Sequence, residues 1–367
     1  MNNQNKQERE KPIVTIDDAV FTSNMEVLLK YHDNPTTKTF RVPEGTIKIG
    51  YRAFCDCTYL EEIILPSSLI VINSFAFSDC TSLKSIVIPN GVRHIQEAAL
   101  KGCTSLQQVE LPETLLSIGS NAFCDCANMT TINLPSQLNW LGDNAFNRCK
   151  LLLSITIPKG VKRIGDHAFC SCHSLRTVEL HEGLVEIGAN AFTNCVSLER
   201  IEIPNTVEKI GHHAFNLCCS LTTIVLPNSL KELGDSAFSR CSNLKQALLP
   251  DSLTTIGHHV FSDCKSLKKI RLPQHLKVLP ASTFDHCKSL IAIDIPMSIE
   301  ELGEYSFSKC IRLKHVHVGA NTTIHEKAFH LCPSSKTIRK YDSKGTTSLN
   351  TEHLLFYAID WLLGRVA

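Results

Sequence analysis

The cysteines are the residues of this sequence with the most obvious capacity for chemistry. Twelve of them stand on an unbroken 23-residue grid from Cys57 to Cys310, and Cys332 follows one residue short of the next position. The chain has seventeen cysteines in all, enough for several disulfides or for thiolate metal sites. Both kinds of site need a particular spacing, so the grid decides between them and a structural role.

The regular spacing favours a buried structural role for the grid cysteines. Parallel strands repeat about every 4.8 Å, so neighbouring cysteines of a stacked repeat come close enough to bridge, but a uniform column offers no defined pairing. A buried thiol behaves as a small hydrophobe. The first twelve residues are polar and charged, without the apolar core of a secretory signal. We therefore expect reduced cysteines and a cytoplasmic protein, with the cell surface, reached by a non-classical route, as the alternative.

His315 and His317 are the best candidates for a metal site. Side chains at positions i and i+2 of a strand project from the same face. Asp294 precedes His317 by one 23-residue step and should lie beside it on the neighbouring strand. Two imidazoles and a carboxylate could hold a metal ion. The simpler interpretation is a polar strand face, and metal binding through His315 and His317 stays an alternative function.

Other classes of function lack their sequence signals. The sequence contains no Ser-His-Asp set, phosphate loop or His-Glu-x-x-His motif, so we expect no enzyme, no catalytic residue and no cofactor. A formal net charge of +1 over 367 residues argues against nucleic acid, which requires a basic footprint. No apolar run reaches the roughly 18 residues of a membrane span.

Other residue types follow the same 23-residue step. Phenylalanine precedes the grid cysteine by three positions in every unit except one, where Leu100 stands, and leucine or methionine follows it by three. A short alternating apolar run comes next, such as Ile86-Val87-Ile88, and proline closes most of these runs. A second apolar pair then ends in Ile-Gly. About thirteen copies between Thr37 and Pro333 predict a solenoid whose units pack only on their neighbours.

Each part of the unit has a predicted conformation. The alternating run predicts a short strand with one face inward, and the proline ends it because proline cannot donate to a ladder. The corner glycine is expected to supply a positive φ. The Ala-Phe-x-x-Cys segment predicts one helical or 3₁₀ turn that points its Phe and Cys into the core. Because identical positions stack, one continuous core is expected along the rod.

This unit resembles the BspA-type leucine-rich repeat, a 23-residue class with an Ala-Phe-x-x-Cys turn. The resemblance covers about residues 13 to 333. It implies a leucine-rich-repeat solenoid, a right-handed curved coil with one short parallel β-strand and a short helical or 3₁₀ turn per repeat. It also implies a surface for macromolecules, often adhesive, in proteins of host-associated bacteria and parasitic protists, and no shared catalytic residues. The departures from the pattern are local, with Asn73, Gln96 and Pro280 in place of the corner glycine.

Four segments follow from the pattern. Residues 1–12 are expected to be a disordered tail, 13–36 an N-terminal cap, 37–333 the repeat array, and 334–367 a C-terminal loop and capping helix. Thr351 can cap that helix, whose apolar face includes Leu354 and Trp361. We expect the helix to cover the last coil, although a partner-binding role stays open.

Specificity can reside only in positions that differ between coils. Two outward columns of the predicted strands differ, with a mixed-charge middle, a basic later part and exposed apolar residues between them. An apolar spot rimmed by charge is typical of a protein interface. The candidate partner-binding residues are Arg176, Glu179, Glu199, Arg200, Glu202, Val225, Leu248, Lys269 and Arg271.

The sequence therefore predicts a non-enzymatic, monomeric scaffold that binds a protein partner through its sheet face. A rigid rod presents ordered side chains, so little conformational entropy is lost on binding. The alternatives are a cell-surface adhesin that binds a host or matrix protein, and a metal-binding protein that uses His315 and His317.

Overall fold

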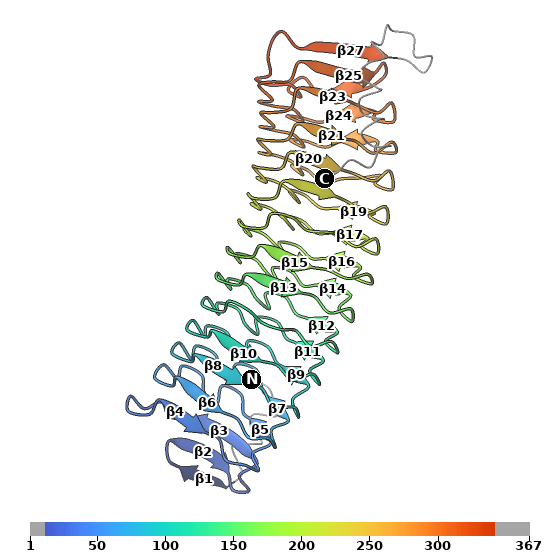
Figure 1. Ribbon diagram of the computed structural model, residues 1–367. Helices are drawn as coiled ribbons and strands as arrows, with labels where there is room; N and C mark the ends of the chain where they lie inside the picture. The colour runs from blue at the N-terminus through green and yellow to red at the C-terminus, as the bar shows by residue number, and fades with distance from the viewer. Residues whose placement is uncertain (1–11, 342–367) are drawn as a thin grey trace.

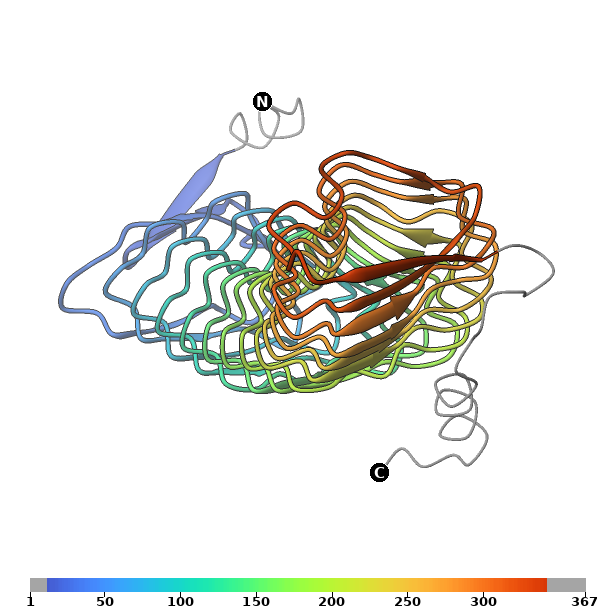
Figure 2. The same cartoon turned by 90° about the horizontal axis from the view of Figure 1, so that it is seen from above.

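The computed structural model describes residues 12–341 and is an elongated, curved stack of coils (Figure 1). Strand β1 (Ile13–Ile16) lies at one end of the stack and β27 (Thr337–Tyr341) at the other. Seen from above, successive coils are displaced from one another, so the stack twists along its length (Figure 2). The predicted leucine-rich-repeat solenoid is confirmed.

Most coils contribute two short strands, where the sequence predicted one. The alternating run forms a three-residue strand, and the pair before the corner glycine forms a two-residue strand on another side of the coil. We call the outward surface of the first series the first sheet face. It contains β4 (Thr39–Arg41), β6 (Glu62–Ile64), β8 (Ser85–Val87), β10 (Gln108–Glu110), β13 (Ser154–Thr156), β15 (Thr177–Glu179), β18 (Thr223–Val225), β20 (Gln246–Leu248), β21 (Lys269–Arg271), β23 (Ala292–Asp294), β25 (His315–Gly319) and β27.

The outward surface of the two-residue strands is the second sheet face. The apolar Ile of the Ile-Gly pair points inward, and the residue before it points outward, as in the exposed–buried pattern of Lys209 and Ile210. The series contains β5 (Lys48–Ile49), β7 (Val71–Ile72), β9 (His94–Ile95), β11 (Ser117–Ile118), β12 (Trp140–Leu141), β14 (Arg163–Ile164), β16 (Glu186–Ile187), β17 (Lys209–Ile210), β19 (Glu232–Leu233), β22 (Val278–Leu279), β24 (Glu301–Leu302) and β26 (Thr323–Ile324).

The strand pairing holds the coils in strict register. Strands of the array pair in parallel, and Ile155 of β13 lies opposite Val178 of β15, one repeat later. The same offset joins β20 to β21 and β23 to β25. Like residues therefore touch like residues along each column. The first series is interrupted in the coils around Thr131 and Arg200, which contribute no strand.

The phenylalanine column forms a stack of rings through the core. The rings of Phe215 and Phe238 lie 5.2 Å apart between centroids and are tilted by only 1°. The spacing widens to 5.7 Å between Phe238 and Phe261. Each such pair contributes about 0.5–1.5 kcal/mol beyond the area it buries. Where Leu100 replaces phenylalanine, the ring column is interrupted.

The grid cysteines lie beside this column and are reduced. All seventeen cysteines are free, and the grid cysteines from Cys57 to Cys310 are buried, which confirms the predicted core column. The structure adds a specific contact, because the Cys195 thiol donates to the carbonyl of Phe169 in the preceding coil at 3.2 Å. That carbonyl also accepts the amide of Cys172 in its own coil. The contact recurs along the grid with Sγ–O distances of 3.1–3.3 Å for Cys80 to Cys310.

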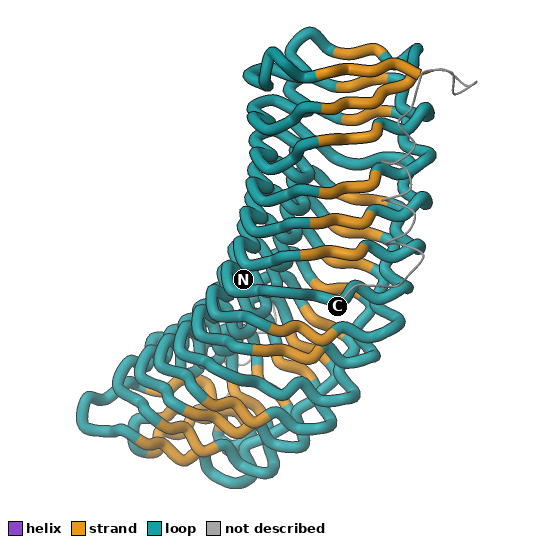
Figure 3. The backbone as a smooth tube through the Cα atoms, turned by 45° about the horizontal axis from the view of Figure 1, so that its top comes forward, coloured by secondary structure: helices purple, strands orange, loops and turns teal. Residues whose placement is uncertain are grey.

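The expected helical turn at Ala-Phe-x-x-Cys is not found, and no helix occurs between residues 12 and 341 (Figure 3). The amide of Cys57 donates to Phe54 within the coil, but the amide of Phe54 donates to Ala76 in the next coil. A helix would keep both bonds inside the segment. Amides that bond within the coil thus alternate with amides that bond to the next coil. This pattern requires a residue in the left-handed conformation before the Ala-Phe pair and another before the cysteine. These are Arg52 and Asp56, with φ values of 55° and 65°.

The corner glycines do not supply that positive φ, which corrects the role expected from the sequence. Positive φ in glycine occurs at Gly45, Gly102 and Gly183 within the described chain, none of which is a corner glycine. The corner glycines instead permit close approach of successive coils. A Cβ on Gly165 would lie 2.6 Å from the carbonyl oxygen of Gly142 and 2.8 Å from the amide nitrogen of Asp143, closer than van der Waals contact allows.

The first coil is covered by an antiparallel hairpin. Strand β1 pairs with β2 (Ala19–Thr22), and β2 pairs with β3 (Val27–Tyr31), which then joins the parallel series by pairing with β5. The ring of Tyr31 stacks on Phe54 at 5.3 Å and extends the ring column to this end. Burial raises the pKa of Tyr31 to about 12.

The C-terminal segment begins with a strand where the sequence suggested a loop. Strand β27 pairs with β25 over five residues, from His315 opposite Thr337 to Gly319 opposite Tyr341. Its Thr-Ile-Arg-Lys-Tyr sequence can extend in this way because β25 offers a free parallel edge. Residues 1–11 of the expected tail at 1–12 lie outside the described residues, and so does the expected capping helix from Thr351. Within the described chain, no helix has the length and apolar composition needed to cross a membrane.

The substitution Gly165→Ala tests the close approach at the corners. The added Cβ must push two coils apart, which we expect to lower the free energy of unfolding by about 1–3 kcal/mol. Gln96→Ala is the matched control, because Gln96 occupies the same column with a Cβ already present, and it should change stability by less than about 0.5 kcal/mol. Chemical denaturation followed by circular dichroism measures both variants. Equal stability of Gly165→Ala and the native protein would contradict the close-approach role.

The thiol column predicts how the native protein reacts with a thiol reagent. Burial raises the pKa of buried thiols such as Cys103 and Cys126, and the thiolate is the reactive form. Under native, non-reducing conditions we expect labelling confined to the part-exposed Cys170, Cys219 and Cys332. All seventeen cysteines should react in denaturant, as counted by mass spectrometry. Fewer labelled cysteines in denaturant without reductant would show disulfides and overturn this picture.

Candidate partner-binding surface

The nine candidate residues lie on the first sheet face over five successive coils. Arg176 directly precedes β15 and Glu179 ends it, while Glu199, Arg200 and Glu202 belong to the next coil, which has no strand. The remaining four lie on three strands that form one sheet, in the order β18, β20 and β21. These are Val225, Leu248, Lys269 and Arg271.

The structure places three of the candidates in one row. Val225 lies opposite Leu248, and Leu248 lies opposite Arg271, on hydrogen-bonded neighbouring strands. Val225 is 59% exposed. Leu248 is half-buried between its two neighbours, although the sequence suggested that it is exposed. The row therefore offers an apolar spot next to a cation, with the leucine recessed.

Arg271 is held in place by a carboxylate from the preceding coil. Its guanidinium Nη2 lies 2.7 Å from Oδ2 of Asp251, and the other oxygen of Asp251 accepts the amide of Gln274 at 2.9 Å. Partial burial opposes ionisation of Asp251, but these two donors outweigh it and hold the pKa of the carboxyl below its usual value. The arginine thus keeps a fixed position at neutral pH while remaining 45% exposed.

The acidic middle of the face is separate from that row. Glu179 accepts a hydrogen bond from the Thr156 hydroxyl at 2.9 Å, which ties it to the sheet of β13 and β15. Because the coil of Arg200 contributes no strand, this sheet ends before β18 begins. The structure therefore brings the candidates together as two neighbouring groups, one acidic and one basic with apolar residues.

The histidine pair has the neighbour that the sequence predicted. Asp294 lies opposite His317, and its Oδ1 is 2.7 Å from the histidine Nδ1. Arg339 lies opposite His317 on the other side, so a cation flanks the position. Within the described chain, the side chains grouped closely enough to hold a metal ion include neither histidine.

Among residues 12–341, the side chains of Cys55, Asp56 and Asp79 lie close enough together to hold a metal ion. The guanidinium of Arg52 donates to the Cys55 thiol at 3.2 Å and lies 3.6 Å from the Asp56 carboxylate. Burial raises the pKa of the Cys55 thiol, which disfavours the thiolate that a metal needs. The arginine thus already supplies the positive charge that these acidic groups attract.

Sequence inspection missed the second sheet face, whose charges are arranged in ladders. Arg163 pairs with Asp143 at 3.0 Å, with Glu186 at 3.4 Å and with Asp166. Comparable pairs one repeat apart join Lys209 to Glu232 at 3.4 Å and Lys231 to Glu208 at 2.8 Å. The sequence did contain a signal for these ladders, because residues of opposite charge are separated by 23 positions. Since these charges neutralise one another, this face offers less free charge to a partner.

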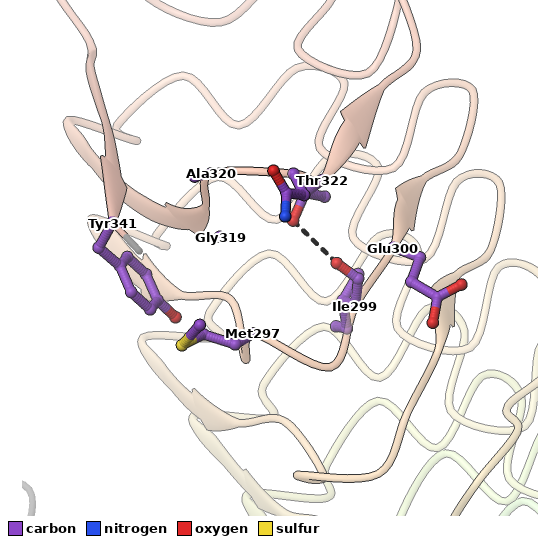
Figure 4. A pocket seen from close by; sticks show the side chains of 8 residues that line it. Met297, Ile299, Glu300, Gly319, Ala320, Thr322 and Tyr341 are labelled. Carbon is purple, nitrogen blue, oxygen red and sulfur yellow. Dashed lines mark hydrogen bonds between the residues drawn. The ribbon is translucent and has the colours of Figure 1, made fainter. Parts of the chain in front are cut away.

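A small cleft lies near the end of the stack, where the last coil departs from the repeat pattern. Its volume is about 190 Å³, and Met297, Gly319 and Tyr341 line it (Figure 4). Gly319 stands where most coils have proline. The hydroxyl of Tyr341 donates to the carbonyl of Ile295 at 2.5 Å, and that of Thr322 donates to Ile299 at 2.8 Å. The polar groups at the cleft are thus largely used within the protein.

Comparison with known proteins identifies the repeat. The family model described as "BspA type Leucine rich repeat region (6 copies)" matches residues 30–152, 141–264 and 231–350. None of the curated proteins compared with the chain matches it.

Solved structures of bacterial proteins share the fold. A leucine-rich repeat protein from Bacteroides ovatus is 24% identical, with a TM-score of 0.70 over 90% of this chain and 98% of that one. A leucine-rich cell surface protein from Faecalibacterium prausnitzii is 26% identical, with a TM-score of 0.55 over 91% and 96% of the two chains. A leucine-rich repeat protein from Eubacterium ventriosum is 22% identical, with a TM-score of 0.50 over 79% and 92%.

Proposed function

The chain belongs to the BspA-type leucine-rich repeat family, and on this basis we propose that it is a non-enzymatic scaffold that binds a protein partner through its first sheet face. The core columns repeat with little change, whereas the outward positions of this face differ from coil to coil. Conserved spacing of the coils with varied exposed side chains suits a surface that recognises one partner.

The observation that carries the proposal is the row of Val225, Leu248 and Arg271 on neighbouring strands. Hot spots of protein interfaces are enriched in arginine and lie where water is excluded. Arg271 is oriented by Asp251 before any partner arrives, and the strands fix the two apolar side chains. Binding therefore costs little ordering of the protein.

A cell-surface adhesin is the second candidate function. The Faecalibacterium prausnitzii protein with this fold is a cell surface protein, and it is 26% identical over most of both chains. An adhesin would use the same face for a host or matrix protein. Protease treatment of intact cells separates the two functions, because a surface protein is cleaved and an internal scaffold is protected.

The quadruple variant Arg200→Ala, Glu202→Ala, Leu248→Ala and Arg271→Ala tests the face directly. We expect the purified partner, first identified by affinity purification from native cells, to bind this variant at least about a hundredfold more weakly, since single hot-spot truncations cost about 2 kcal/mol or more. The melting temperature should stay close to that of the native protein, because three of the four side chains are exposed and Leu248 is half-buried. Isothermal titration calorimetry measures the affinity.

The matched control replaces two arginines, one glutamate and one aliphatic residue away from the first sheet face. It combines Arg93→Ala, Arg148→Ala, Glu97→Ala and Val185→Ala, all of which are exposed positions, and should bind the partner as the native protein does. Undiminished binding by the first variant, or equal loss in both, would place the interface elsewhere.

A further inference from the structure

Positive charge gathers on the first sheet face from Lys245 onward. Each coil offers three outward positions here, namely the residue before the strand and the first and third strand residues. From Lys245 to Arg339, seven of these positions are basic and one, Asp294, is acidic. From Lys38 to Val225, five are basic and six are acidic. The seven residues, which we call the basic zone, are Lys245, Lys268, Lys269, Arg271, Lys314, Lys336 and Arg339.

Carboxylates of the described chain leave much of this charge uncompensated. Asp294 is engaged by His317 at 2.7 Å, and Asp251, beside the zone, is engaged by Arg271. Within residues 12–341, no ion pair joins Lys245, Lys268 or Lys314 to a carboxylate. The contrast with the second sheet face is clear, because Lys209 and Lys231 there each have an acidic neighbour.

The backbone holds these lysines in an ordered array. The amide of Lys268 donates to the carbonyl of Lys245 at 2.9 Å, so the two residues lie one above the other on successive coils. In the later coils, the amide of Lys314 donates to Ile291 and that of Thr337 donates to Lys314, each at 2.7 Å. The cations therefore follow the rod at the spacing of parallel strands, about 4.8 Å per coil. Such a fixed row of like charge attracts a complementary partner and speeds its association.

Apolar side chains are interleaved with the cations. Ile291 is 41% exposed and stands between Lys268 and Lys314 in the same column, and the half-buried Leu248 lies opposite Arg271. No Phe, Tyr or Trp occupies the outward positions of these coils, so the aromatic platforms on which unpaired bases stack are missing there. A polypeptide with both acidic and apolar side chains matches this mixture better than a nucleic acid or a sulfated glycan does.

We propose that the basic zone binds an acidic segment of a protein partner, with carboxylates of that segment paired to Lys245, Lys268 and Lys314. The inference rests on the proposed function, because it states the chemistry that the partner presents to the first sheet face. It extends the interface beyond the row of Val225, Leu248 and Arg271 to the last described strand.

The test uses the full chain and labelled poly-L-glutamate as the probe, with binding followed by fluorescence anisotropy. The triple variant Lys245→Gln, Lys268→Gln and Lys314→Gln should bind the probe about tenfold more weakly, because three exposed ion pairs are lost and each contributes modestly. The control Lys150→Gln, Lys159→Gln and Lys162→Gln removes the same charge from exposed positions off the first sheet face and should stay within about twofold. Binding should weaken as salt is raised.

Three results would overturn the inference. They are the absence of probe binding at low salt, equal affinity of the triple variant and the native protein, and tighter binding of heparin, single-stranded DNA or phosphatidylserine vesicles through the same three lysines. Melting curves identify any variant that fails to fold, and Lys268→Gln alone then replaces the triple variant.

The outcome is separable from that of the proposed function. If the native partner still binds through Arg200, Glu202, Leu248 and Arg271 while poly-L-glutamate does not bind, the scaffold function stands and the acidic-segment inference fails. If the quadruple variant keeps its partner, the proposed interface fails whatever the probe does.

Discussion

Contact between identical positions of successive coils is the constraint on which this structure depends. It is clearest at the carbonyl of the core phenylalanine, which accepts the cysteine amide of its own coil and the cysteine thiol of the next. A thiol is small enough to stay buried and can still donate a weak hydrogen bond. An aliphatic residue of similar size could fill the space but would lose that bond. The cysteine grid is therefore a structural device in which reduced sulfur ties one coil to the next.

The sequence predicted which residues lie inside and which repeat unit they form, because burial follows the 23-residue period directly. It did not predict where backbone amides bond. The Ala-Phe-x-x-Cys segment has helical spacing, yet alternate amides such as that of Phe54 bond to the next coil, and only the stacked neighbour reveals this. For the same reason the corner glycines were assigned the wrong role. Glycine is needed at position 165 because the backbone of Gly142, a residue of another coil, lies so close. The φ angle of Gly165 does not require it.

The candidate surface was predictable only in part, for a related reason. Alternation within the strand identified outward residues such as Val225 and Arg271. The residue just before each strand falls outside that alternation. Arg176 and Glu199 were selected at this position, but Lys245 and Lys314 were not recognised as part of the same face. The half-burial of Leu248 depends on its neighbours in adjacent strands and has no signal in a single repeat. The two-residue strands, and the ion-pair ladders that they carry, required the register between coils to be known.

The replacement of one phenylalanine by Leu100 has a mechanical consequence. In a stack of nearest-neighbour contacts, no distant contact shares a load applied along the axis. The ring column is interrupted between Phe77 and Phe123, and the sheet that begins with β4 ends at β10 in the coil of Cys103. The ring column and this sheet thus lose continuity in neighbouring coils. A rod pulled from both ends therefore relies in this region on the two-residue strands β9, β11 and β12, which pair with one another without a break.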